Sequence, residues 1–185
     1  MDFESVRNLS LNPLTGYWYR GLNLRHYDSR LSTEHSRSSA SRFSLGSGRK
    51  PYRTLYLSEN HQVASFEIGA MFGTPENLVT DTRNSWLLLS LDLKLYRIVD
   101  LCEESQQHLL QTNRQELTGN WLNSSGEAPT QSLGNALYNA KRIEGFLCPS
   151  AKTDGKNLVI FPDRLDSKST IIFNNMHKRK TEQLR

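Results

Sequence analysis

An acidic side chain, Glu67, interrupts an apolar pattern in the stretch LYLSENHQVASFEIGAMFG, residues 55–73. The stretch predicts a short strand, an N-cap at Ser58 and a helix that Gly69 and Gly73 weaken or end. Glu67 lies in the middle of that helix's apolar face. The other members of the face are Val63, Ala64, Phe66, Ile68, Ala70 and Met71. A carboxylate is costly there, so Glu67 is either a structural acid bonded to a buried arginine or tyrosine or a group that faces a cleft.

The elements that must position this glutamate can be read from the spacing of apolar residues. Strands are predicted at 16–22, 55–57, 85–95, 96–101, 145–150, 157–163 and 169–175, with a break before residue 96, and helices within 103–122 and 131–142. Residues 28–50, rich in Ser, Arg and Gly, form either a disordered linker or a long loop over a site. Because the strands gather late in the chain around few helices, we expect an α+β fold with a mixed or antiparallel sheet core and flanking helices.

Length and composition indicate one globular domain. The 185 residues suffice for a single core, 36% of them are hydrophobic, and the mean hydropathy is -0.61. No apolar run has the length of a membrane span, and no secretory signal is visible, so we expect a cytoplasmic protein without membrane contact. The domain is predicted to cover 1–176, followed by a disordered basic tail over 177–185.

The charge of the chain favours an anionic ligand, and the spacing of its cysteines gives no sign of a metal site. The net charge is +4, and arginines are dispersed over the first third of the chain, which suits an anionic ligand better than a long nucleic-acid duplex. Cys102 and Cys148 belong to no Cys/His cluster, so they are predicted to be buried free thiols. We therefore expect no metal site.

Four segments taken in order resemble the RES-domain family, whose members are toxins of bacterial RES–Xre type toxin–antitoxin pairs. These segments are YWYR, RFSLGSG followed by LYLSENHQVASFE, YRIVDL, and the long stretch from PTQSLGNAL to NLVIFPDRL. The likeness runs from Tyr17 to Asn174, and its most specific parts are LYLSE and GFLCPSA followed by NLVIFP. It implies an ADP-ribosyltransferase-like fold.

The family's named residues map onto single positions of this chain. Its arginine falls on Arg20, its glutamate on Glu67, its serine on Ser150 and the tyrosine of its YxSE motif on Tyr56. A second arginine, from a GRWN motif, falls on Arg42, where this chain departs from the motif and has SRFS.

The resemblance implies chemistry on NAD as a substrate. Departure of the cationic nicotinamide needs no strong acid, whereas the positive charge that develops on the ribose needs stabilisation. A carboxylate in a partly apolar wall supplies it and can also orient or deprotonate the nucleophile. Glu67 is the predicted catalytic carboxylate.

The other mapped residues receive roles by chemical type. Arg20 is expected to grip the diphosphate, with Arg42 as a second phosphate ligand. Tyr56 is expected to stack on nicotinamide or bond a ribose hydroxyl, and Ser150 to donate to the ribose or the carboxamide. Ser58 lies close to the site, as a helix N-cap or a further NAD ligand.

The leading functional hypothesis is a toxin that depletes NAD and arrests growth by cleaving the nicotinamide–ribose bond, with water or phosphate as acceptor. The alternative is a protein mono-ADP-ribosyltransferase that uses the same site. A third hypothesis is a non-enzymatic basic module that binds nucleic acid. A toxin of this kind implies a separate antitoxin protein that blocks the site, so that any contact with nucleic acid would be made through that partner.

Overall fold

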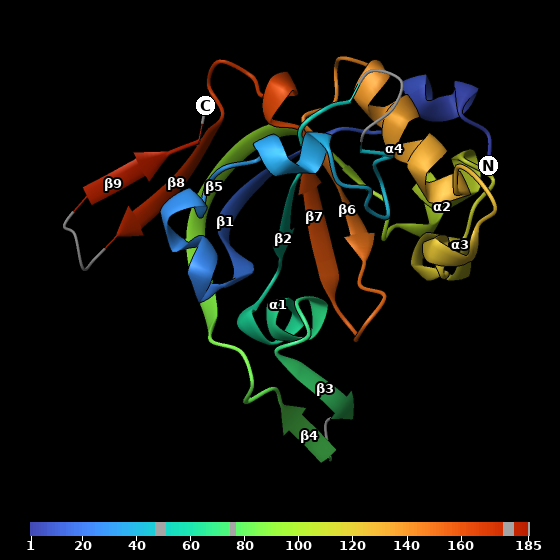
Figure 1. The fold of residues 1–185 in the computed structure, drawn as a ribbon. Helices are drawn as coiled ribbons and strands as arrows, with labels where there is room; N and C mark the ends of the chain where they lie inside the picture. The colour runs from blue at the N-terminus through green and yellow to red at the C-terminus, as the bar shows by residue number, and fades with distance from the viewer. Residues whose placement is uncertain (47–50, 75–76, 176–179, 185) are drawn as a thin grey trace.

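The computed structural model describes residues 1–46, 51–74, 77–175 and 180–184, and its main element is a sheet of seven strands. The strands lie in the order β1-β2-β7-β6-β5-β8-β9 (Figure 1). Because β1 also pairs with β5, the five strands from β1 to β5 in this order form a closed ring. Strands β5 and β6 run parallel, and the other described pairs are antiparallel. The predicted α+β fold with a mixed sheet is confirmed.

The strands and helices have the following bounds. The strands of the main sheet are β1 Asn12–Asn23, β2 Leu55–Ser58, β5 Trp86–Asp100, β6 Gly145–Pro149, β7 Lys156–Ile160, β8 Thr170–Asn175 and β9 Lys180–Gln183; β3 Met71–Thr74 and β4 Asn77–Thr80 form a separate hairpin. The helices are α1 His61–Glu67, α2 Glu104–Leu109, α3 Arg114–Thr118 and α4 Pro129–Asn139, with 3-10 turns η1 Glu4–Asn8, η2 Leu24–Ser29, η3 Glu34–Arg37, η4 Trp121–Asn123 and η5 Pro162–Arg164.

Two apolar cores flank the sheet. One lies between the sheet and helices α3 and α4, and it includes Phe43, Phe146 and Phe161. The other is formed largely by alternate residues of β5, such as Leu91 and Leu93, which are fully buried. The alternation holds from Leu89 to Leu95 and then changes phase, so that Ile98 and Val99 are both buried, and the register with β1 shifts at the same point. The strand nevertheless runs unbroken from Trp86 to Asp100, so the break predicted before residue 96 is wrong.

Helix α1 carries Glu67 and begins two residues later than predicted. Its N-cap is Asn60, whose Oδ1 accepts from the backbone N–H of Val63 at 2.9 Å. Ser58 is therefore not the cap; it ends strand β2. The helix packs closely on β1, because a Cβ on Gly21 would lie 2.6 Å from the Ile68 side chain.

The end of the chain joins the sheet. Strand β9 pairs antiparallel with β8, and Glu182 forms an ion pair with buried Arg30, which follows η2. The prediction of a disordered tail over 177–185 is therefore wrong for 180–183; residues 176–179 and 185 lie outside the described part. In that described part, no helix is both long and apolar enough to cross a lipid bilayer.

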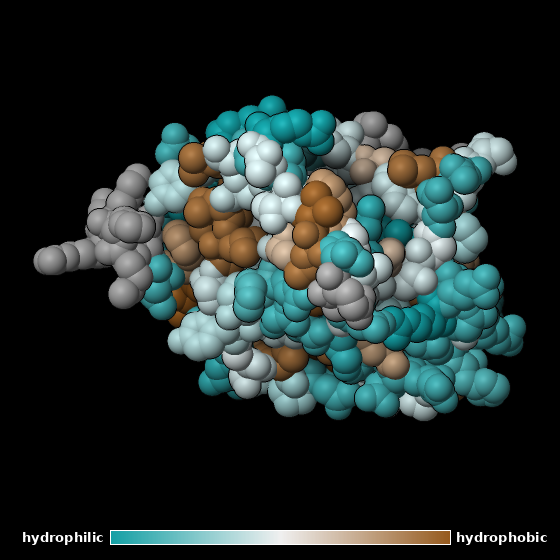
Figure 2. Space-filling view, turned by 90° about the horizontal axis from the view of Figure 1, so that it is seen from below, coloured by the Kyte–Doolittle hydropathy of each residue, from teal (hydrophilic) through white to brown (hydrophobic). Residues whose placement is uncertain are grey.

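The hairpin β3–β4 extends from the end of the molecule that carries α1 (Figure 1). It exposes Phe72, Leu78 and Val79. Figure 2 views this end of the molecule and shows apolar patches surrounded by hydrophilic surface. Single apolar side chains are common on protein surfaces, and these three lie on a hairpin that buries none of its own described residues.

Candidate functional site

A cavity of about 410 Å³ opens between α1, one face of the sheet and the loop before β2. This volume is in the range of sites for small molecules and cofactors. Residues that line it include Tyr19 and Gly21 of β1, Tyr56 and Ser58 of β2, Glu67 and Ile68 at the end of α1, Arg42 and Phe43 of the loop, and Trp121, Cys148, Lys152 and Asn157. Residues from five separate stretches of the chain therefore meet here.

Glu67 faces this cavity from the last turn of α1 and is half-buried. Its Oε1 atom accepts two hydrogen bonds of 2.6 Å, one from Ser150 Oγ and one from Asn157 Nδ2. Neither partner is the buried arginine or tyrosine that a structural acid was expected to have. Both donors address the same oxygen, so the carboxylate is oriented by Oε1 alone.

The hydroxyl of Ser150 is fully used within the protein. It accepts from the backbone N–H groups of Lys152 at 3.1 Å and Thr153 at 3.3 Å, and it donates its one proton to Glu67. Ser150 is buried and stands beside Glu67, as the sequence mapping requires. Its proton, however, is committed to the carboxylate, so the expected donation to ribose or carboxamide would require this bond to break.

Tyr56 lines the cavity, and its hydroxyl binds the neighbouring loop. It lies 2.8 Å from Ser41 Oγ and accepts from the backbone N–H of Phe43 at 3.3 Å. Burial raises the pKa of Tyr56 well above its usual range, so the group stays a neutral phenol. Tyr56 thus lines the cavity and holds the loop that forms one of its walls.

Arg42 lies in that wall. Its Nη1 donates to the backbone carbonyls of Leu117 and Gly119, which hold the guanidinium at the cavity. Helix α4 supports the same loop from behind at Gly134, where a Cβ would lie 2.0 Å from the Phe43 carbonyl oxygen. Only glycine allows this approach.

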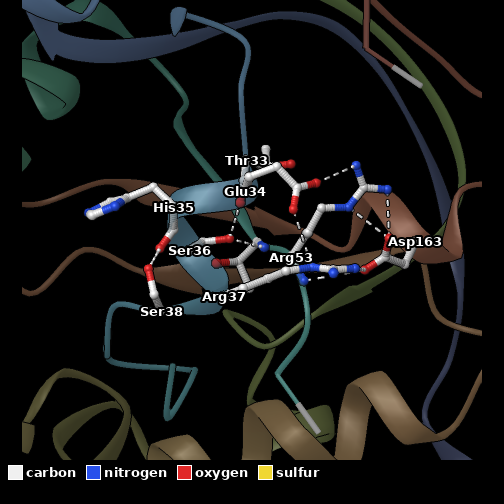
Figure 3. Close-up of polar contacts among 9 residues, drawn as sticks. Thr33, Glu34, His35, Ser36, Arg37, Ser38, Arg53 and Asp163 are labelled. Carbon is white, nitrogen blue, oxygen red and sulfur yellow. Dashed lines mark hydrogen bonds and ion pairs between the residues drawn. The ribbon is translucent and has the colours of Figure 1, made fainter. Parts of the chain in front are cut away.

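A polar cluster fixes the start of the loop (Figure 3). Arg53 Nε donates to Asp163 Oδ1 at 2.7 Å, and its Nη1 lies 3.4 Å from Glu34 Oε1. Ser36 Oγ accepts from the backbone N–H of Thr54 at 2.8 Å. Of the two alternatives for residues 28–50, the described part through residue 46 is thus a structured loop that borders the site.

Arg20 does not line the cavity. Side chains alternate along a strand, and the neighbours Tyr19 and Gly21 face the cavity, whereas Trp18 and Leu22 belong to the opposite core. Arg20 Nη2 donates to the carbonyl of Ser32 at 3.3 Å, and Nη1 is buried with no hydrogen-bond partner among the described residues. Burial lowers the pKa of Arg20 to about 10.

Three cavity residues received no role from the sequence. Asn157 binds Glu67 directly, Lys152 adds a cation, and Trp121 is half-buried in the wall. Asn157 opens NLVIFP, one of the segments that carry the family resemblance, so its position was a usable signal. Ser58 donates to Asn157 Oδ1 at 2.8 Å.

The two cysteines are free, as predicted; Cys148 is buried, whereas Cys102, also predicted to be buried, is half-buried. Burial raises the pKa of the Cys148 thiol well above its usual range and that of Cys102 to about 12, which favours the protonated, less nucleophilic form near neutral pH. Across the described ranges, no group of three His, Cys, Asp or Glu side chains could hold a metal ion.

Comparison with known proteins gives one family and one described structure. The model of the RES domain matches residues 17–178. The crystal structure of the M. tuberculosis MbcT–MbcA toxin–antitoxin complex contains a similar chain, with a TM-score of 0.66, 16% sequence identity, and coverage of 98% of this chain and 91% of that chain. At this identity the likeness shows the fold alone. A search among curated proteins finds no match.

Proposed function

This chain belongs to the RES-domain family, and from that premise we propose that it cleaves the nicotinamide–ribose bond of NAD+, with water or phosphate as acceptor. One observation carries the proposal: the Glu67 carboxylate is held at the cavity by two hydrogen bonds to Oε1, while no described residue bonds Oε2. A carboxylate that is only structural is expected to use both oxygens. The free oxygen is available to a ligand.

The proposed reaction uses this free oxygen. The bond between the ribose C1′ and the nicotinamide nitrogen breaks, and its electron pair leaves with the ring, which becomes neutral. The positive charge on the ribose is stabilised by the Glu67 carboxylate, whose effect is strengthened because the side chain is half-buried and so less screened by water. Water or phosphate then attacks C1′, and Glu67 can receive a proton from the attacking water.

We further propose that the diphosphate binds near Arg42 and Lys152. These are the two cationic side chains among the described residues that line the cavity. Arg42 is already oriented by two carbonyls, so little side-chain entropy is lost when it binds a ligand. This assignment moves the diphosphate contact expected for Arg20 to residues that face the cavity. Tyr56 and Tyr19 offer aromatic surface for the nicotinamide.

The physiological role that we propose is that of a toxin paired with a separate antitoxin. The similar solved chain comes from a toxin–antitoxin complex, which supports this proposal. Depletion of NAD would explain growth arrest, and a partner that covers the cavity would prevent it.

The test is NAD consumption by the purified full chain, with and without phosphate, with the products identified by mass. Glu67→Gln is a sharp variant, because the glutamine carbonyl can keep both hydrogen bonds to Oε1 while the free oxygen becomes an amide. We expect a loss of about 100-fold or more in kcat with an unchanged melting temperature. Glu104→Gln, at an exposed position of α2, is the matched control.

Consumption of NAD by Glu67→Gln at the rate of the unmodified protein would contradict the proposal. The product masses identify the acceptor, because water yields ADP-ribose and phosphate yields its 1-phosphate ester. Labelled NAD added with a cell extract separates these reactions from protein ADP-ribosylation, which would leave label on a protein band.

A further inference from the structure

We propose that Asn157 and Ser58 are positioning residues that orient the Glu67 carboxylate, and that they do not bind the substrate. The inference rests on the proposed function, since it assigns how the catalytic carboxylate of that function is held. The three side chains form a chain of hydrogen bonds, Ser58 Oγ to Asn157 Oδ1 at 2.8 Å and Asn157 Nδ2 to Glu67 Oε1 at 2.6 Å.

The direction of each bond in this chain follows from the chemistry of the groups. An ionised carboxylate only accepts, so the asparagine must turn its NH₂ group toward Glu67. The asparagine carbonyl oxygen then faces Ser58, and a carbonyl only accepts, so the Ser58 hydroxyl must donate. Ser58 thus selects the orientation of the amide, and its one proton is not available to a ligand.

The sheet provides the rigidity that the helix lacks. Ser58 and Asn157 are directly opposite each other in the antiparallel pair β2–β7, so their side chains share one face and are close in space. Glu67 is the last residue of a helix of seven residues. Ser150, which follows β6, holds the same oxygen from another element. Two anchors on the sheet side thus orient a carboxylate that comes from a short helix.

The consequence for catalysis is specific. Loss of the Asn157 donor leaves Glu67 with one anchor, and its carboxylate can rotate away from the reacting ribose carbon. A displacement of about 1 Å in a reacting group can cost about 100-fold in rate. The binding of NAD does not use Asn157, so KM should change little.

The test compares kcat and KM for NAD consumption by the full chain. We expect Asn157→Asp, which replaces the donor with a repelling carboxylate, to lower kcat by about 10- to 100-fold with KM within about threefold. Ser58→Ala should lower kcat less, and Ser58→Thr, which keeps the hydroxyl, should restore it. Asn139→Asp introduces the same charge at an exposed position of α4 and should leave both constants unchanged.

A double-variant cycle tests whether Asn157 affects kcat through Glu67. If Asn157 acts through Glu67, Asn157→Ala should reduce turnover in the unmodified protein but cause no further loss in Glu67→Gln. An unchanged kcat in Asn157→Asp and Ser58→Ala, or a rise in KM at constant kcat, would overturn the positioning role. Absence of NAD turnover in the unmodified protein would instead refute the proposed function, so the two failures are distinct.

Discussion

Single residues differ most clearly in how their charges are compensated, as two glutamates show. Glu144 is fully buried, and both of its carboxylate oxygens accept hydrogen bonds. Oε2 accepts from the backbone N–H groups of Tyr96 and Arg97, each at 2.7 Å. Oε1 accepts from the backbone N–H of Asp166 at 2.5 Å and from the hydroxyl of Ser169. Glu67 has only Oε1 satisfied. The first pattern is that of a structural acid, and the second leaves one oxygen for a ligand.

Arg20 provides a prediction at this scale. No described residue bonds its buried Nη1, and desolvation lowers the pKa of Arg20 to about 10. We expect Arg20→Met to unfold at a higher denaturant concentration, with a gain on the order of 1 kcal/mol, because an unsatisfied buried donor is removed while the aliphatic packing is kept. A clear loss of stability would show that the guanidinium is better compensated than its contacts indicate. NAD turnover of the same variant tests the role that family mapping gives to Arg20.

Among the elements, α1 matters most for the site, because it is short and carries Glu67, the proposed catalytic carboxylate. Isolated helices of this length are unstable, so α1 depends on its cap and on its packing against Gly21 of β1. Replacement of the cap by Asn60→Ala should reduce the free energy of unfolding by about 1 kcal/mol. Urea denaturation measures this, and Asn60→Asp, which keeps an acceptor oxygen, should lose much less.

The turn between β4 and β5 yields a prediction of pH dependence. Hydrogen bonds, above all from the side chain of Asn84, lower the pKa of Asp81 from 3.8 to about 2. Because the folded pKa is below the unfolded one, the ionised group stabilises the fold above about pH 4, and this contribution is lost as pH falls toward about 2. Asp81→Asn should therefore be less stable than the unmodified protein at neutral pH, and thermal melts should show the difference shrinking through that acidic range. A constant difference would contradict the prediction.

At the scale of the whole molecule, two features link distant parts of the chain: the closed ring of strands and the ion pair between Arg30 and Glu182. Strand β1 pairs with β5 along almost its full length. Glu182 of β9 forms an ion pair with Arg30, the residue that follows η2. Arg30 also lies over the rings of Tyr27 and Phe173. The segment after η2 and the last described strand are thus joined by an ion pair.

Because Arg30 is buried, we expect the loss of Glu182 to destabilise the fold more than the loss of Arg30. Glu182→Gln leaves the buried Arg30 charge without its ion pair and should cost about 2 kcal/mol in the free energy of unfolding. Arg30→Met removes that charge and should cost less, provided that the methionine packs between the two rings. Equal losses in chemical denaturation would refute the asymmetry, and NAD turnover should be unaffected in both folded variants.

The sequence alone determined those features that depend on local periodicity and on residue type. The leucine alternation of β5, the order of the elements other than hairpin β3–β4 and strand β9, and the carboxylate Glu67 on an apolar helix face were all visible in short windows. The hairpin β3–β4 was not predicted. The ordered segments also identified the family. Errors arose where one residue decides the outcome, as in the cap of α1, the supposed break in β5 and the strand at 180–183.

Only the tertiary structure decided which groups meet Glu67 and which face of β1 borders the cavity. Ser150 and Asn157 lie 83 and 90 residues from Glu67 along the chain, and no local pattern encodes such a distant hydrogen bond. The placement of Arg20 depends on strand register, since a shift by one residue moves every side chain to the other face. Local spacing therefore specifies the elements, whereas the pairing of distant strands specifies the site.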